Sequence, residues 1–485
     1  MGPTCSSGHI HDTQVPDQQG ELASSSPPVF PLLDLPQEVL LNIVAAVDQR
    51  ESSPTFPEGP SEDLLALSRV NRWFHRVSFP RVWRSVRWTN PGRLRPPAFL
   101  AARSLAAFKA ILEARTEPLP IQEFSVEDPT GEFGSAEAED EDERETAALV
   151  QIIKRLAASG LQVLFLKEVL LSKQEANDLM EAIFTAPRLS ALRFNQVSHS
   201  GTIRSFDEVS PLVHIRTCQI MHGSSSLLNL VPKCPNLDSL LLWPSSRRLG
   251  VHANTIKALL PRLRLLSMDS VHEGTAFRTI ADEILRLSSL PYADPLPLEE
   301  LFLEGSMTVS SRTVLLSSLA HLPSLRRIAL YQYRSPKPAL LSELAAVAPQ
   351  LNSLTIVSGD CERSVEWPAP VDEYLPYLSK FPHLRFFAWD RKSPQPSDLS
   401  SSTSPTSPQA RIPQARLEFE TMAKLARVCP SLEEAVVITK DYSEGSQGFF
   451  ATFTKEKGKI RIALKSKTVN DFLIAHDRWV RVEED

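Results

Sequence analysis

The stretch Pro323-Ser-Leu325-Arg-Arg-Ile328-Ala-Leu330 contains a pattern that recurs through most of the chain. Its form is P-x-L-x-x-Φ-x-Φ, where Φ is an apolar residue. With 39 prolines and 65 leucines among 485 residues, and 42% apolar residues, independent placement predicts about one accidental match. The chain holds seven, which indicates a structural repeat, and the other six begin at Pro187, Pro235, Pro261, Pro349, Pro382 and Pro430.

Two further copies lack the proline and begin at Leu161 and Leu298, and a degenerate copy is expected near Leu212. Neighbouring copies are often about 26 residues apart, as are Leu237 and Leu263, a period typical of solenoids. Side chains alternate along a strand, so the apolar residues at +3 and +5 after the leucine face the same side. Helical patterns fill the intervals at 174–184, 276–290, 314–322 and 339–347.

A single strand–helix unit cannot bury its own apolar face, whereas stacked units bury theirs in one continuous core. We therefore predict an α/β fold of short parallel strands with helices behind them. The alternative is an ordinary α/β domain with a doubly wound sheet. That fold favours glycine-rich phosphate loops, but the chain has 17 glycines and no G-x-G-x-x-G or G-x-x-x-x-G-K motif.

The period and the L-x-x-L-x-L core of the pattern resemble leucine-rich repeats. The resemblance predicts a leucine-rich-repeat solenoid over residues 161–440. Repeated Ser-Pro and Thr-Pro pairs at 393–411 predict a disordered insertion within it.

Three ordered pieces precede the repeats. They read Leu33-Asp-Leu-Pro-Gln-Glu-Val-Leu-Leu-Asn-Ile-Val44, then Asp63-Leu-Leu-Ala-Leu-Ser-Arg-Val-Asn-Arg-Trp-Phe74, then Phe79-Pro-Arg-Val-Trp83. Together they resemble the F-box, a three-helix module, over residues 33–88. The loop from Arg50 to Glu62 is longer than the usual F-box connection. The matching positions are Leu35, Pro36, Glu38, Val39, Leu40, Ile43, Leu64, Leu67, Val70, Phe74 and Trp83.

An F-box followed by leucine-rich repeats resembles substrate receptors of cullin-RING ubiquitin ligases, here of the fungal type. The resemblance implies that the F-box docks a Skp-family adaptor, and through it a cullin, while the repeats hold a target protein. Some F-box proteins act instead as scaffolds outside ubiquitination, and the sequence does not separate the two. The adaptor-binding residues implied are Leu35, Pro36, Val39, Leu40, Ile43, Leu67, Val70 and Trp83.

The remaining segments have distinct compositions. Residues 1–29 are rich in Ser, Pro, Gln and Gly and predict a disordered tail. Residues 98–160 are expected to form a helical linker with an acidic loop, or the start of a helix, at 127–145. Residues 446–485 predict a cap on the solenoid's open end, with a hairpin at 448–464 followed by a helix at 469–479.

Residues at +2, +4 and +6 of each repeat are expected on the concave, strand-lined face of the solenoid. Aromatic and arginine side chains dominate binding energies at protein interfaces. We therefore predict a target-binding patch on this face. An alternative is that Trp243 and Phe302 pack under an inserted loop. The patch residues are Arg193, Trp243, Phe302, Arg327 and Tyr331.

No enzyme signature is present. The chain lacks H-E-x-x-H, G-x-S-x-G and calcium-loop motifs, so we expect no catalytic residues, metal or cofactor. Five scattered cysteines without a C-x-x-C pair favour reduced thiols in the cytoplasm or nucleus. A net charge of −6 and the lack of a long apolar run argue against nucleic-acid and membrane partners.

Overall fold

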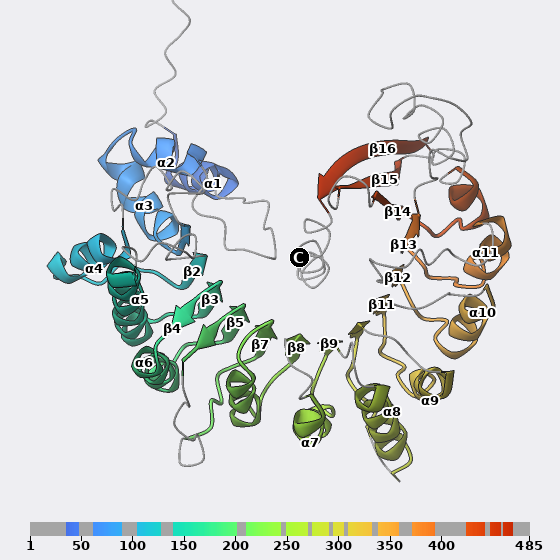
Figure 1. Cartoon of the computed structure of the whole chain (residues 1–485). Coiled ribbons are helices and arrows are strands. Elements are labelled where there is room, and N and C mark those ends of the chain that lie inside the picture. Colours follow the sequence, from blue (N-terminus) through green and yellow to red (C-terminus); the bar gives the residue numbers. More distant parts are fainter. Residues whose placement is uncertain are drawn as a thin grey trace, which may run out of the picture.

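The structure of the chain is a computed structural model. It describes residues 35–47, 62–89, 104–127, 139–200, 210–243, 249–269, 274–290, 294–304, 309–331, 338–357, 371–392, 423–441, 447–456 and 459–468. Strands line the inside of a wide arc, and helices cover its outside (Figure 1). The predicted tail at 1–29, the insertion at 393–411 and the terminal helix at 469–479 lie outside the described residues.

Fourteen strands form one sheet in the order β1-β2-β3-β5-β7-β8-β9-β10-β11-β12-β13-β14-β15-β16. The first twelve strands, from β1 to β14, run parallel to one another. Strand β15 pairs antiparallel with β14 on one side and with β16 on the other. A second, narrow sheet pairs β4 (Leu170–Leu171) with β6 (Ser198–His199). The large sheet consists of β1 Ser85–Thr89, β2 Glu123–Glu127, β3 Val163–Lys167, β5 Ala191–Asn195, β7 Thr217–Met221, β8 Ser239–Trp243, β9 Leu265–Asp269, β10 Glu300–Glu304, β11 Arg327–Tyr331, β12 Ser353–Val357, β13 Phe386–Lys392, β14 Glu434–Asp441, β15 Gln447–Glu456 and β16 Lys459–Thr468.

Helices lie on the outer side between most successive parallel strands (Figure 1). They are α4 Leu105–Ala114, α5 Glu139–Ser159, α6 Lys173–Thr185, the 3-10 helix η2 Ser225–Lys233, α7 Leu249–Leu259, α8 Gly274–Ser288, α9 Val309–Leu319, α10 Pro338–Val347 and α11 Val371–Leu378. Three more helices precede the sheet: α1 Gln37–Val47, α2 Glu62–Ser68 and α3 Arg72–Val82. The α/β, solenoid-like architecture predicted from the repeat is therefore confirmed at this level.

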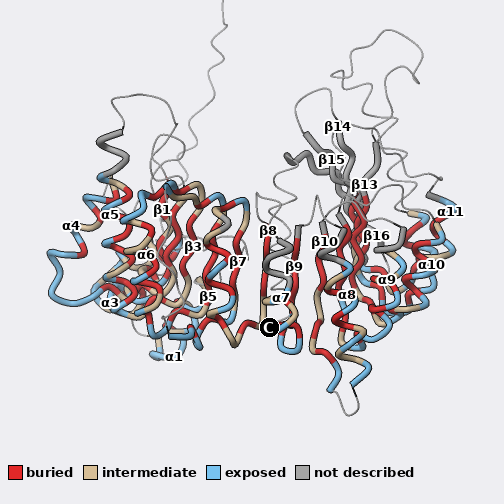
Figure 2. Tube along the Cα trace, turned by 60° about the horizontal axis from the view of Figure 1, so that its bottom comes forward, coloured by how far each residue is buried: buried red, intermediate tan, exposed pale blue. Residues whose placement is uncertain are grey.

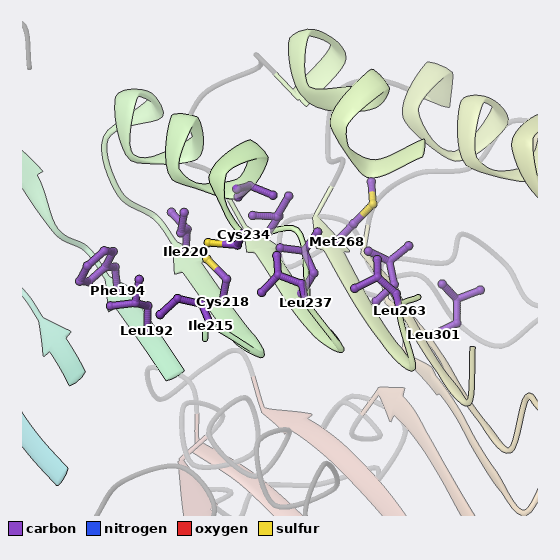
Figure 3. Close-up of a cluster of buried hydrophobic side chains, with 14 of the residues drawn as sticks. Leu192, Phe194, Ile215, Cys218, Ile220, Cys234, Leu237, Leu263, Met268 and Leu301 are labelled. Carbon is purple, nitrogen blue, oxygen red and sulfur yellow. The ribbon is translucent and has the colours of Figure 1, made fainter. Parts of the chain in front are cut away.

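One continuous core runs between the strands and the outer helices (Figure 2). The residues at +3 and +5 of the repeat lie in it, as Leu192 and Phe194 do at 0% exposure. Figure 3 shows Leu192, Phe194 and Ile220 reaching from their strands toward the helix layer, close to Cys218 and Cys234. Both cysteines are free and buried, and burial raises the pKa of the Cys234 thiol to about 12. These thiols act as small apolar core groups.

Backbone hydrogen bonds repeat at every junction between the twelve parallel strands. The carbonyl of the residue just before each of the first eleven strands accepts two consecutive N–H groups of the next unit, with N···O distances of 2.7–3.1 Å. This keeps the strands in register although the helices between them differ in length. We call the residues that directly precede the twelve parallel strands the edge row, because they lie along the N-terminal ends of the strands. They are Arg84, Gln122, Gln162, Ser190, Arg216, Asp238, Arg264, Glu299, Arg326, Asn352, Arg385 and Glu433.

The sheet begins two strands before residue 161, where the solenoid was expected to start. Strands β1 and β2 belong to it, so residues 98–160 are not a purely helical linker. The leucine position of the repeat is filled by Trp83 before β1 and by Ile121 before β2. A search for leucine misses both, although their apolar side chains fill the same position. The degenerate copy expected near Leu212 likewise begins at Ile215 and leads into β7.

The acidic block at 127–145 includes the start of a helix, one of the two forms expected for it. Helix α5 starts at Glu139. Acidic residues are common at this position because the N-terminus of a helix carries a partial positive charge. The Glu145 carboxylate accepts hydrogen bonds from the N–H groups of Leu105 (2.6 Å) and Ala106 (3.5 Å) at the start of α4. This part of the acidic run therefore caps a neighbouring helix.

The hairpin expected at 448–464 is present as β15 and β16, which pair antiparallel and extend the sheet beyond β14. Its strands are longer than expected, reaching Glu456 and Thr468. Because it pairs with β14, the hairpin covers the backbone edge that the last parallel strand would otherwise expose.

Candidate functional site

The three N-terminal helices form a module with a small core. Its buried apolar residues are Leu40, Val44, Leu64, Phe74 and Val82. Asn71 starts α3 because its side-chain oxygen accepts the N–H groups of Trp73 and Phe74, each at 2.9 Å. A core of this size gives only marginal stability, so the module depends on its surroundings.

The adaptor-binding residues expected from the sequence fall into three groups. Pro36, Val39 and Val70 are exposed, and the exposed fractions of Val39 and Val70 reach 40% and 59%. Leu40 is buried inside the module and has little surface to offer a partner. Leu35, Ile43, Leu67 and Trp83 are half-buried and pack against the module's core.

Trp83 has a second structural role. It packs against both the module's core and the continuous core of the sheet. Phe79 also packs against the core of the sheet. The two rings lie 6.3 Å apart, and the guanidinium of Arg115 sits over Phe79 at 5.6 Å. Strand β1 begins two residues after Trp83, which joins the module closely to the solenoid.

The concave face of the sheet carries the side chains that alternate with the core residues. The strand pairings align one central residue of each strand in a row across it. This centre row is polar at the N-terminal end and apolar at the C-terminal end. It consists of Arg87, Ser125, Phe165, Arg193, Gln219, Leu241, Ser267, Phe302, Ala329, Thr355, Ala388 and Val436.

An ionic cluster occupies the N-terminal end of this face. The Glu127 carboxylate accepts a hydrogen bond from Arg87 at 3.0 Å and a short one from Lys167. Burial raises the pKa of Glu127, but the hydrogen bonds and charges of Lys167 and Arg87 outweigh it and lower the pKa below its usual 4.5. The carboxylate is thus held charged between two cations on neighbouring strands.

Substituting Glu127→Gln is expected to reduce the free energy of unfolding at pH 7 by about 1–3 kcal/mol, because charge-assisted hydrogen bonds to two cations are lost. The folded-state pKa is lowered, so the stabilisation is present at neutral pH and disappears as the pH falls below 4.5. Urea unfolding of both proteins at pH 7 and pH 3 measures this. A constant difference between them at the two pH values contradicts the assignment.

An apolar cluster occupies the C-terminal end of the concave face. It contains Phe302 and Ala329 at 5% and 0% exposure, with Leu241 and Phe386 packed against it. Its further members are Leu265, Val357, Ala388 and Val436. Phe302 is therefore closely surrounded rather than projecting into solvent.

The predicted target-binding residues all lie on concave-face strand positions but are not gathered at one point. They span strands β5 to β11, about 24 Å at the usual strand spacing. Arg193 and Arg327 are each 8% exposed, and Arg327 pairs with Glu300 at 3.4 Å. Trp243 is 7% exposed, and its Nε1 donates to Ser267 Oγ at 2.9 Å. The backbone of Tyr331 ends β11, while its side chain lies outside the described part.

Half-exposed residues between these positions were not selected from the sequence. Asn195 and Met221 end strands β5 and β7, and Leu241 lies in the centre row of β8. All three lie on the concave face close to Trp243 and are partly exposed. Their row position was readable from the repeat, but their exposure depends on how neighbouring strands shield one another.

Several polar atoms on the concave face are buried without a hydrogen-bond partner. Among the described residues these include Asn195 Oδ1, Ser239 Oγ and Thr355 Oγ1, together with the hydroxyls of Ser125 and Ser353. Buried polar groups are nearly always hydrogen-bonded in folded proteins. This face therefore offers polar groups that a bound partner or water can satisfy.

The described part of the chain holds no group of three or more His, Cys, Asp or Glu placed to bind a metal. No described helix is both long and apolar enough to span a bilayer.

Comparisons with known proteins leave the resemblances as sequence-based expectations. No protein-family model matches the chain, and no curated protein is significantly similar to it.

Proposed function

We propose that the chain is a substrate-recognition subunit of a Skp-adaptor, cullin and F-box ubiquitin ligase. The three-helix module would dock the adaptor, and the concave face of leucine-rich repeats would hold the target protein. The observation that carries the proposal is the exposure of Val39 and Val70 on a module with five buried apolar core residues. Both residues stand at positions that match the F-box pattern, and a helical module this small commonly needs a partner to cover its remaining apolar surface.

The concave face supports the second half of the proposal. Strand-lined inner surfaces of solenoids commonly bind extended partners. Here the face combines an ionic end around Glu127, an apolar end around Phe302 and buried polar atoms without partners. Such a mixture can give a target protein both apolar contact area and hydrogen bonds.

Affinity purification of the full chain from cells, read by mass spectrometry, tests the proposal. Recovery of a Skp-family adaptor together with a cullin supports the ligase. Recovery of the adaptor without a cullin supports a scaffold acting outside ubiquitination. Recovery of neither contradicts the proposed function.

The target-binding face has its own prediction. Leu241→Glu is expected to lower recovery of co-purifying targets at least about tenfold, because it places a charge in the apolar part of the interface. Adaptor recovery should not change, since Leu241 lies in β8, far along the sheet from α1–α3. Leu290→Glu is the matched control, as Leu290 is a 46% exposed leucine just after α8. Equal losses in both variants would reject the concave face as the binding surface.

A further inference from the structure

The edge row carries an alternating pattern of charge along its last eight positions. From Arg216 onward its residues are Arg, Asp, Arg, Glu, Arg, Asn, Arg and Glu. Three ion pairs follow from this order: Arg216–Asp238 at 3.6 Å, Arg264–Glu299 at 3.0 Å and Arg385–Glu433 at 2.8 Å. Asn352 stands at the one position of this series where the alternation calls for an acid.

The missing carboxylate leaves Arg326 in a distinct environment. The Arg264 guanidinium makes a bidentate pair with Glu299, whereas Arg326 Nη1 donates to the carbonyl of Pro323 in its own turn at 3.1 Å. Within the described residues, Arg326 has no ion pair. Arginine presents donors whose planar geometry matches a carboxylate or phosphate, so the arrangement lacks an anionic partner here.

A cavity of about 580 Å³, open to solvent, lies at this position. Arg326, Asn352 and Arg385 line it, together with Gln350, Pro382, His383, Ser431 and the acidic Glu433. Arg326 and Arg385 stand two strands apart, about 10 Å at the usual spacing, on either side of Asn352. Their long side chains can reach one oxyanion placed between them.

Asn352 provides an independent indication. Its Oδ1 is buried and has no hydrogen-bond partner. The oxygen and nitrogen of such an amide are assigned from their hydrogen bonds, and exchanging them turns a buried acceptor that lacks a partner into a donor. Asn352 as a whole is half-buried and lines the cavity between the two arginines.

We propose that this cavity binds an oxyanion, a phosphate or carboxylate group, in the place of the absent acidic side chain. The anion would accept hydrogen bonds from Arg326 and from the Asn352 amide, with Arg385 and the Ser431 hydroxyl beside it. Glu433 already compensates the charge of Arg385, so a lone anion is expected to bind in the millimolar range, near −4 kcal/mol. The site lies at the N-terminal ends of β11, β12 and β13, apart from the concave face. It does not depend on the proposed function.

Placing a carboxylate at position 352 tests the site. In Asn352→Asp the new carboxylate completes the alternation and competes with the anion. The apparent Kd for inorganic phosphate is expected to rise at least about tenfold, the effect of losing one charge-assisted contact and gaining repulsion. Arg326→Gln should weaken phosphate binding by a similar factor. Titration followed by 31P NMR at constant ionic strength, using the full chain, measures both.

Gln162→Glu is the matched control. It adds the same charge to the same edge row, but its neighbours there are Gln122 and Ser190, and no arginine flanks it. Its phosphate affinity should equal that of the unmodified chain. Parallel titrations with acetate distinguish a carboxylate site from a phosphate site. No measurable phosphate or acetate binding by the unmodified chain, or equal weakening in Gln162→Glu and Asn352→Asp, would overturn the proposal.

Discussion

Val70→Asp is expected to weaken binding to a Skp-family adaptor at least about 100-fold, because a charge would be buried in an apolar contact. Val70 lies in the turn between α2 and α3, and 59% of it is exposed. It packs little against its own chain, so the melting temperature should remain within about 2 °C of the parent. Surface plasmon resonance with purified adaptor measures the affinity.

Val213→Asp provides the control for this result. Val213 is 45% exposed, and it precedes β7 in the solenoid, outside the three-helix module. The same chemical change there should leave adaptor binding intact. If Val70→Asp binds the adaptor as tightly as the parent chain, the module is not the docking surface, and the F-box interpretation fails with it.

Phe74→Ala is expected to unfold the three-helix module while the solenoid stays folded. Phe74 is 0% exposed and is the largest side chain in the module's core. Truncating a buried phenylalanine costs about 3–5 kcal/mol, a large share of the stability that a core of five residues can supply. Hydrogen exchange should show protection lost in α1–α3 and retained in the strands from β3 to β12.

Phe108→Ala provides the complementary measurement. Phe108 is also 0% exposed, but it belongs to α4 and stacks on Phe124 of β2 at 6.3 Å. Its loss should reduce protection around β1, β2 and α4. If Phe74→Ala removes protection across the whole sheet, the module and the solenoid form one cooperative unit, which contact through Trp83 would then explain.

The repeat was sufficient to predict most of the solenoid, because its leucines recur at a spacing that only stacked strands and helices can bury. The hairpin at its end was equally readable, since its residues alternate around a short turn. The start of the sheet could not be predicted from the repeat. Trp83 and Ile121 replace the leucine before β1 and β2, and their membership of the sheet depends on side-chain volume rather than on residue identity.

The candidate binding surfaces, too, could be predicted only in part from the sequence. The alternation of the strands placed Arg193, Trp243, Phe302 and Arg327 on the concave face, as the sequence indicated. It did not indicate that all four would be nearly buried, because their exposure depends on residues from strands far apart in the chain. The exposed pair Val39 and Val70 could be separated from the buried Leu40 only when the three helices were packed together.

Residue order by itself determined the strand–helix unit, the direction of its apolar face and the three ordered pieces of the N-terminal module, since these depend on periodicities of two and 3.6 residues. The tertiary structure alone decided which side chains remain accessible. It also brought Arg326, Asn352 and Arg385 together at one cavity, because register between stacked strands aligns residues that the sequence separates by 26 to 59 positions.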